Sequence, residues 1–179
     1  MNQTKRSIKV SVAEIAEAID NSSIEIRYYL DLETGKIPFI TEEDTLLLDQ
    51  VIREHGDPAT GEVDWASVLP KLDLDDYEKE NLVIVNAIEA DDSARYLAIP
   101  RPSSREGYND MFEFIATLSN ARLQVRLENA IKGRGAFRAF KDALSAYPTE
   151  RQAWFRFRDQ RTRQRALDWM EAEGIEAIG

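Results

Sequence analysis

Alternating apolar and polar residues predict a β-hairpin in the first quarter of the chain. Residues 24–32 read IEIRYYLDL, in which every second residue is apolar, as in a half-buried strand. The turn at 33–36 contains Gly35, the residue type that best tolerates a positive φ, and residues 37–40 return as a second strand. Pro38 cannot donate to a strand ladder, so this second strand is expected to be short or to lie at an edge.

Apolar residues at intervals of three and four predict helices through most of the remaining chain. Ser11 and Ser103 each stand three residues before a glutamate, and these two capping boxes mark helix starts. The run LVIV fits helical spacing within residues 74–90 and also fits a buried strand; we favour the helix. Further helices are expected from residues 41, 64, 120, 136 and 149, and short strands near residues 8–10, 95–99 and 175–178.

The expected core faces follow from the same spacing. Phe137 and Phe140 are expected in the core, because Leu144 and Tyr147 continue their stripe. The helix from residue 103 is expected to turn inward Tyr108, Met111, Phe112, Ile115 and Leu118. The last helix is expected to start at a Thr149–Gln152 cap pair and to bury Phe155, Thr162, Ala166, Trp169 and Met170.

These elements indicate an α+β fold, a mostly helical single domain over residues 1–179 with a small antiparallel sheet built on the hairpin 24–40. The length fits one domain, or one domain of two lobes. The lobes would be an acidic α/β lobe at 1–100 and a more basic helical lobe at 101–179.

Charge is divided unevenly along the chain, whose net charge is -10. Residues 1–94 carry 22 acidic and 8 basic side chains, whereas residues 95–179 carry 11 acidic and 15 basic ones. The two halves can attract each other within the fold, or the basic half can face an external polyanion. We favour the internal pairing, because surface charges are usually solvated or loosely paired.

Composition excludes several classes of protein. The chain is 43% apolar and 31% charged, which indicates a folded globular protein rather than a disordered one. The absence of cysteine excludes disulfides, thiolate nucleophiles and zinc–thiolate sites, and it fits a reducing compartment. Residues 1–11 lack the apolar core of a signal peptide, and no apolar run approaches the roughly 20 residues of a membrane span. We expect a soluble, cytoplasmic protein with no membrane partner.

Arginine and aromatic residues are interleaved between residues 122 and 165, a composition that suits phosphates, bases or an acidic protein face. At 100° per residue, Trp154, Arg158, Arg161 and Arg165 fall within roughly 60° of one another on the last helix. This ridge is either a recognition surface for phosphates or carboxylates, or an arginine stripe that pairs with the acidic half of the chain and partly buries the tryptophan. We favour the second interpretation.

A second basic cluster, made of Lys132, Arg134, Arg138 and Lys141, surrounds the glycines of the run at 133–135. Glycine lets a ligand approach the backbone closely, and the following helix start favours anions, so this turn could hold a phosphate. The run lacks the length and the lysine position of a P-loop, and we favour a helix–helix turn in which glycine supplies the C-cap.

The sequence contains no recognisable catalytic motif. His55 is the only histidine, which excludes multi-histidine metal sites, and no G-x-S-x-G is present. Asp73, Asp75 and Asp76 resemble part of a calcium loop, but the glycine is missing and Ile84 stands where the bidentate glutamate would be. We expect no catalytic residues, no metal and no cofactor, although carboxylate catalysis stays open because acidic residues are abundant.

Three runs resemble uncharacterised protein family 0158. They are Arg105-Glu106-Gly107-Tyr108, then GRGAFRAFKD at 133–142, then Trp154 with Phe157; the hairpin segment 29–35 is similar too. The resemblance extends from about residue 24 to residue 174. The family has no assigned activity, so the resemblance implies a single-domain cytosolic prokaryotic protein and supplies no catalytic residues.

The first hypothesis is therefore a non-enzymatic binding protein with a basic–aromatic face for nucleic acid or an acidic protein. The alternatives are a carboxylate-dependent hydrolase or nuclease-like enzyme, and a regulatory subunit of a complex that uses the acidic half for contact. The candidate binding residues are Trp154, Arg158, Arg161, Arg165, Lys132, Arg134, Arg138 and Lys141.

Overall fold

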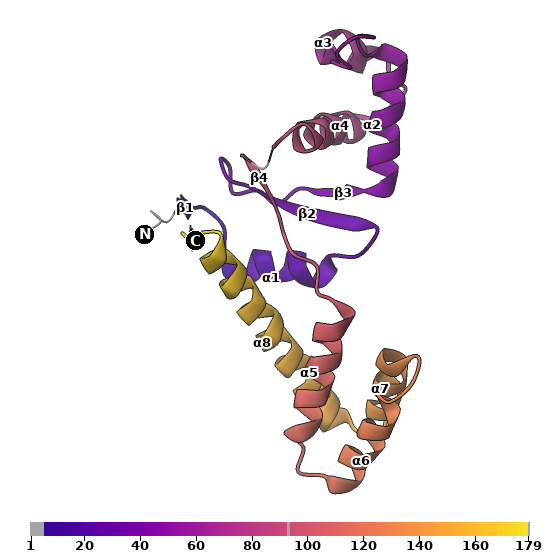
Figure 1. Cartoon of the computed structure of the whole chain (residues 1–179), viewed down its shortest axis with the longest axis vertical. Helices are drawn as coiled ribbons and strands as arrows, with labels where there is room; N and C mark the ends of the chain where they lie inside the picture. Colours follow the sequence, from indigo (N-terminus) through magenta and orange to yellow (C-terminus); the bar gives the residue numbers. More distant parts are fainter. Residues whose placement is uncertain (1–5, 93, 179) are drawn as a thin grey trace.

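A short strand near each end of the chain joins the beginning of the fold to its end. The computed structural model describes residues 6–92 and 94–178. Residues 1–5, which belong to the segment in which the sequence shows no apolar signal-peptide core, lie outside the described residues. Strand β1 (Arg6–Ile8) pairs in parallel with β5 (Ile175–Ala177). Figure 1 shows these two strands side by side at one end of α8. The strands predicted near residues 8 and 175 are thus confirmed, and they form a sheet of their own.

A second sheet in the described chain has the antiparallel order β3-β2-β4. Its strands are β2 (Ile26–Asp31), β3 (Phe39–Thr41) and β4 (Tyr96–Ala98). Strand β3 lies at an edge, as Pro38 predicts, and the carbonyl of Pro38 accepts a 2.9 Å hydrogen bond from the amide of Tyr29. The central strand begins at Ile26 rather than at Ile24, whose side chain is 85% exposed.

The helices follow their sequence signals closely. The capping boxes at Ser11 and Ser103 are both formed, and the LVIV run is helical. The start of the last helix was predicted wrongly: it begins at Pro148 after Tyr147, and no side chain caps it. Proline suits the first helical position because its missing N–H would have no partner there anyway. The helices are α1 (Val12–Asn21), α2 (Glu42–His55), α3 (Trp65–Val68), the 3-10 helix η1 (Leu69–Lys71), α4 (Asp76–Glu89), α5 (Ser104–Ala116), α6 (Ala121–Ala130), α7 (Ala136–Leu144) and α8 (Pro148–Ala172).

Buried side chains among the described residues form three clusters, and α8 contributes to two of them. Helix α8 is 25 residues long, which corresponds to about 38 Å. Its second half packs on α1 and the strands through Ala166 and Met170, and its first half packs among α5, α6 and α7 through Trp154. The third cluster lies between α2, α4 and the sheet. Figure 1 shows α8 running from the strands towards the end occupied by α6 and α7. The predicted α+β class is confirmed, and the division into lobes stays a prediction.

Several aromatic residues were predicted on the wrong side of their helices. On α5, Phe114 is 2% exposed and Phe112 is 61% exposed, and Tyr108 is also partly exposed. Phe137 on α7 and Phe155 on α8 are 44% and 40% exposed, so neither is a core residue, whereas Phe140 is buried as predicted. The inward face of α5 includes a buried aspartate, Asp110. Apolar spacing does not predict this face, because it takes only apolar residues as buried.

Candidate functional site

The arginines of the predicted ridge on α8 are held by carboxylates of α5. Arg161 Nε donates to Asp110 Oδ1 at 2.9 Å, and Arg165 Nη2 donates to both oxygens of Asp110 at 2.8 and 2.7 Å. Asp110 is only 3% exposed. Two guanidiniums thus neutralise one buried carboxylate, and hydrogen bonding to Asp110 raises the pKa of Arg161 above its usual value.

Outer carboxylates complete this network. Glu113 and Glu106 lie 3.4 Å from Arg161 and Arg165 respectively, and Arg158 pairs with Asp20 of α1 at 3.1 Å. The internal pairing of the ridge is therefore confirmed, but the predicted partner is only partly right. Within the described ranges, Asp20 is the ridge's one ion-pair partner from residues 1–94. The others lie on α5 or, for Asp159, on α8 itself, all in the same basic half.

Trp154, the aromatic residue of the ridge, belongs to the core. Its ring lies 4.8 Å from the ring centre of Phe140 and 5.2 Å from that of Phe114, both edge-on, and it stacks on Phe157 at 6.1 Å. The side chain is 8% exposed. A base or an external side chain therefore has no open face of this indole on which to stack.

The second basic cluster, by contrast, is open to solvent. Lys132, Arg134, Arg138 and Lys141 are all exposed, at the turn between α6 and α7 and along α7. Lys132 donates to Asn129 at 3.1 Å, and Arg138 makes a loose 3.9 Å pair with the exposed Asp142. Such exposed pairs contribute little, so the four charges stay available to a partner.

The turn itself serves as a helix connection. Gly135 has a φ of 76° and is the N-cap of α7, where no side chain makes a capping bond. A Cβ on Gly133 would meet no atom within 4 Å, so this glycine is not required by close packing. The turn between two helices is therefore confirmed, but the predicted glycine C-cap is wrong: Ile131 is the C-cap of α6, and Gly135 instead begins α7. Binding of a phosphate at the turn stays a prediction.

The exposed ring of Phe137 on α7 contacts α5. A Cβ on Gly107 would lie 2.8 Å from Cε1 of Phe137, so the Phe137 ring rests directly on the backbone of α5. Tyr108 follows Gly107 and Phe112 lies one turn further; their exposed fractions are 38% and 61%. We call Gly107, Tyr108, Phe112 and Phe137 the aromatic seam. Because Arg138 follows Phe137 directly and Arg134 stands three residues before it, the seam borders the second basic cluster.

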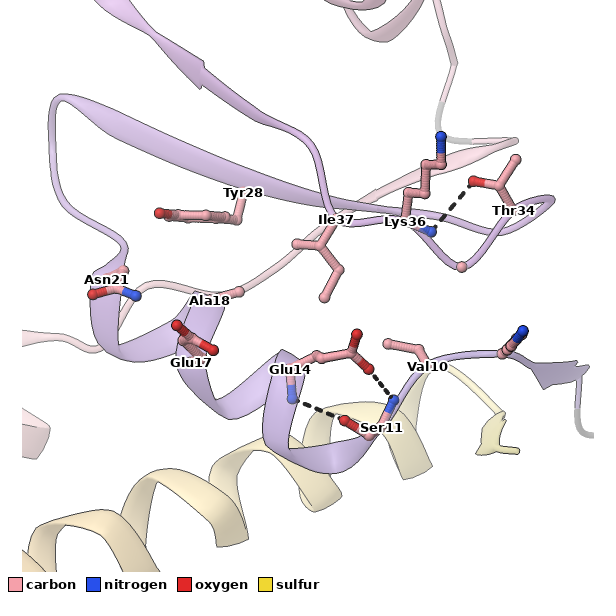
Figure 2. A pocket seen from close by; sticks show the side chains of 12 residues that line it. Val10, Ser11, Glu14, Glu17, Ala18, Asn21, Tyr28, Thr34, Lys36 and Ile37 are labelled. Atoms are coloured by element: carbon pink, nitrogen blue, oxygen red, sulfur yellow. Dashed lines mark hydrogen bonds between the residues drawn. The ribbon is translucent and has the colours of Figure 1, made fainter. Parts of the chain in front are cut away.

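A separate concavity lies between α1 and the β2–β3 hairpin (Figure 2). It measures about 730 Å³, and its walls mix carboxylates, lysines and apolar side chains. No sequence motif predicts this concavity, because its two walls come together only through packing of α1 against the sheet. Its residues include Lys9, Glu14, Glu17, Tyr28, Lys36 and Ile37.

The described residues contain no group of three His, Asp or Glu side chains that could hold a metal ion. Nor does any helix in the described part of the chain combine the length and the apolar character needed to cross a membrane.

Comparison with known proteins identifies relatives but no activity. The model of the family described as uncharacterised protein family UPF0158 matches residues 67–178. A protein of Pseudomonas aeruginosa that carries the same family name is 27% identical over 172 residues, which cover 96% of this chain and 87% of that protein. No solved structure matches the chain.

Proposed function

Since the chain belongs to uncharacterised protein family UPF0158, whose name assigns no activity, we propose a function from its surface: a non-enzymatic cytoplasmic protein that binds single-stranded nucleic acid. The binding surface is the aromatic seam together with the second basic cluster on α7. The observation that supports the proposal is the contact of Phe137 with Gly107, which holds an exposed ring of α7 beside weakly paired cations and next to the exposed Tyr108 of α5 in the chain.

The chemistry of this surface fits an unpaired strand. Exposed aromatic rings stack on bases that have no partner, and each stacked base contributes about 1–3 kcal/mol. Lysine and arginine neutralise the phosphates between the bases and release counterions. A duplex hides the faces of its bases, so it would use only the basic part of the surface.

The location of the surface reduces the opposition from the protein's net negative charge. Residues 119–145 carry six basic and two acidic side chains, so this segment is locally positive. The acidic residues concentrate in the other half of the chain, and at physiological salt charges further than about 8 Å away are largely screened. We therefore expect measurable binding at low salt and a steep loss as salt rises.

The test is fluorescence anisotropy with labelled oligo(dT) and oligo(U) at about 50 and 200 mM salt. We expect binding that weakens with salt at about 0.7 log units per neutralised phosphate and per log unit of salt. The triple variant Arg134→Gln, Arg138→Gln and Lys141→Gln should bind more weakly and with a smaller salt dependence. Tyr108→Ala with Phe112→Ala should weaken binding without changing the salt dependence.

A matched triple variant, Arg53→Gln, Lys71→Gln and Arg163→Gln, removes the same charge from exposed positions elsewhere. Equal weakening by both triples would show nonspecific attraction and would refute the proposed surface. Absence of binding at the lower salt concentration would refute nucleic-acid binding altogether. Binding of poly-glutamate in place of the oligonucleotides would move the function to the alternative of an acidic protein partner.

A further inference from the structure

We propose that the free edge of β3 and the cleft beside it bind an extended basic peptide, one that carries a lysine or arginine between apolar residues. In this mode of recognition a peptide adds a strand to the edge of a sheet, and a neighbouring pocket selects one of its side chains. The site lies on the β2–β3 hairpin and α1, so it goes beyond the nucleic-acid surface of α5 and α7 and does not depend on it.

The outer side of β3 presents backbone groups that the sheet does not use. Amides of β2 donate to the carbonyls of Lys36 and Pro38 at 2.9 Å each, so alternate residues of this segment face β2. Ile37 and Phe39 therefore direct their N–H and C=O groups away from β2, each with one donor and one acceptor. Because β3 is an edge strand of the described sheet, no strand pairs with these groups.

Pro38 does not protect this edge, although proline often does so by removing an outward N–H. Its carbonyl faces β2, so the N–H that it lacks would also have pointed towards β2. The available edge ends at Thr41, whose amide donates to Asp44 at 2.8 Å. The donors and acceptors of Ile37 and Phe39 thus stay open to an added strand.

The cleft of about 730 Å³ begins at the same edge, because Ile37 also lines it. Figure 2 shows the Ile37 side chain directed from the hairpin into the space above α1. In an added strand, the residue opposite Ile37 has its side chain on the same face of the sheet and enters this space. Val10 and Ala18, which are 1% and 3% exposed, line the cleft with apolar surface for the aliphatic part of a long side chain.

Carboxylates of α1 make a cationic side chain the best occupant. Figure 2 shows the carboxylates of Glu14 and Glu17 on the side of α1 that faces the hairpin. Glu17 has no hydrogen-bond or ion-pair partner within the described chain. Glu14 Oε2 accepts from the Ser11 amide at 2.7 Å, and this bond lowers the pKa of Glu14, so its side chain stays ionised.

Lysines near the cleft do not oppose this charge at the end where Tyr28 lies. Figure 2 shows Lys36 directed away from the cleft, and the backbone of Lys9 lies against the hairpin turn, at the other end from Tyr28. Residues 10–26 and 37–44, which contain α1 and β3, carry four and three acidic side chains and no basic ones. A basic peptide is therefore attracted to this edge, and an acidic one is repelled.

The test is an NMR titration of the full chain with the peptide acetyl-TVKVT-amide, to about 10 mM. We expect the amide resonances of Ile37, Phe39 and Ala18 to shift. Exchange of the Ile37 and Phe39 amides with solvent should slow, because the peptide supplies their missing acceptors. The peptide acetyl-TVEVT-amide differs in one charged side chain and should bind at least roughly tenfold more weakly.

N-methylated peptides test the pairing with β3 without changing the protein. A methyl group on the amide of the central lysine blocks pairing in an antiparallel complex, and methyl groups on both valine amides block it in a parallel one. We expect one of these two peptides to bind at least roughly tenfold more weakly and the other to bind like the unmodified peptide. Equal binding of the two would show that the peptide does not pair with the edge.

Point variants separate the edge from the cleft. Phe39→Pro removes the outward N–H, whereas Phe39→Ala removes the ring and keeps this donor, so the proline variant should bind the lysine peptide at least roughly tenfold more weakly than the alanine variant. Glu17→Gln should weaken the lysine peptide and should not weaken the glutamate peptide. Glu80→Gln, at an exposed position of α4 outside the cleft, should change neither. Urea denaturation of each variant checks that it is folded.

Absence of shifts at Ile37 and Phe39, or equal binding of the lysine and glutamate peptides, would overturn the proposal. Analytical ultracentrifugation tests a different occupant of the edge. A dimer of the peptide-free protein that Phe39→Pro converts to a monomer would show that a second copy pairs with β3, and it would also overturn the proposal. Failure of nucleic-acid binding would not alter these results, because none of these variants lies on the nucleic-acid surface.

Discussion

The ring of Phe137 on α7 rests on the backbone of Gly107 on α5, with no room for a side chain between them. This contact joins two of the runs that carry the resemblance to the family, at 105–108 and 133–142. The third run meets them nearby, since Trp154 packs on Phe140 in the same cluster. The close approach of the Phe137 ring thus explains why position 107 is a glycine. The same contact holds the partly exposed ring of Phe137 in place.

Substitution of Gly107 by alanine should have opposite effects in two backgrounds. In the wild type, Gly107→Ala should destabilise by about 1 kcal/mol, because crowding against Phe137 costs about 1–3 kcal/mol and the gain in helix propensity is about 1 kcal/mol. In a Phe137→Ala background the crowding is absent, and the same change should stabilise. Urea denaturation of the four proteins of this cycle measures the coupling. Additive effects would show that the ring does not rest on Gly107.

The two phenylalanines of α7 should differ strongly in their contribution to stability. Phe140→Ala should cost about 3–5 kcal/mol, because the ring is fully buried between Phe114 and Trp154. Phe137→Ala should cost about 1–2 kcal/mol, because nearly half of its surface is already in water. Urea denaturation gives both values, and similar costs would contradict the different burial.

Gly35 should tolerate alanine less well than Gly61 does. Both have a positive φ, 73° and 72°, so alanine costs about 1–2 kcal/mol at either position from backbone conformation alone. At Gly35 a Cβ would also overlap the backbone carbonyl of Lys9, whereas at Gly61 the nearest atom would be 3.9 Å away. We expect the melting temperature to fall further for Gly35→Ala, and further still for Gly35→Val. Equal shifts for the two alanine variants would show that Lys9 does not approach the turn.

The ion pair between Asp31 and Arg95 should make the protein sensitive to acid. Arg95 donates to both oxygens of Asp31 at 3.0 and 2.8 Å, Thr34 and the Glu33 amide donate as well, and Asp31 is 5% exposed. The Arg95 bonds, chief among these, hold the pKa of Asp31 well below its usual range. Because the pKa of Asp31 is lower in the folded than in the unfolded protein, its ionisation stabilises the fold at pH values above the unfolded pKa of about 3.9. This stabilisation is lost as the pH falls below that value.

Stability measured between pH 7 and pH 2 tests this assignment. Asp31→Asn should destabilise by about 3–5 kcal/mol at pH 7, because it leaves Arg95 without its buried partner. Below about pH 4 the difference between variant and wild type should shrink, since the wild-type carboxyl then loses its advantage. Asp57→Asn, at an exposed aspartate held by backbone amides, serves as a control and should show a much smaller difference. A difference that stays constant with pH would contradict the role of the Asp31 charge.

Asp110 should contribute more to stability than either exposed glutamate that pairs with the same arginines. Asp110→Ala leaves Arg161 and Arg165 facing each other without their common counter-charge and should cost about 3–5 kcal/mol. Glu113→Ala removes an exposed partner and should cost no more than about 1 kcal/mol. Chemical denaturation at two salt concentrations checks both values. A small effect of Asp110→Ala would indicate that the two arginines find other partners.

Local signals in the sequence predicted much of the fold, whereas long-range burial escaped prediction. The caps at Ser11 and Ser103, the turn at Gly35 and the edge strand after Pro38 depend on residues within four positions of one another. The inward face of α5 depends on Asp110, which is buried only because arginines about 50 residues later neutralise it. Because the sequence does not show this pairing, apolar spacing favours Phe112 rather than Phe114 as the buried residue.

The candidate sites show the same limit. The arginines of α8 were recognised as a ridge, but their partners on α5 could not be read from residue types alone. The cleft beside α1 has no sequence motif, since its carboxylates and lysines lie on segments that meet only in the folded chain. The aromatic seam also depends on a contact between residues 30 positions apart, Gly107 and Phe137.

The parallel pairing of β1 with β5 sets an order for folding during synthesis. Arg6 leaves the ribosome before every other described residue, and its partner Ile175 is among the last to appear. The cluster around Ile8 and Val10 includes Met170 and Ile175, so the earliest hydrophobic residues cannot complete their packing until the latest ones arrive. The cluster of α2, α4 and the sheet contains only residues up to Tyr96 and can close first. A nascent chain halted before residue 160 should therefore protect that third cluster from proteolysis while the beginning of the chain stays sensitive.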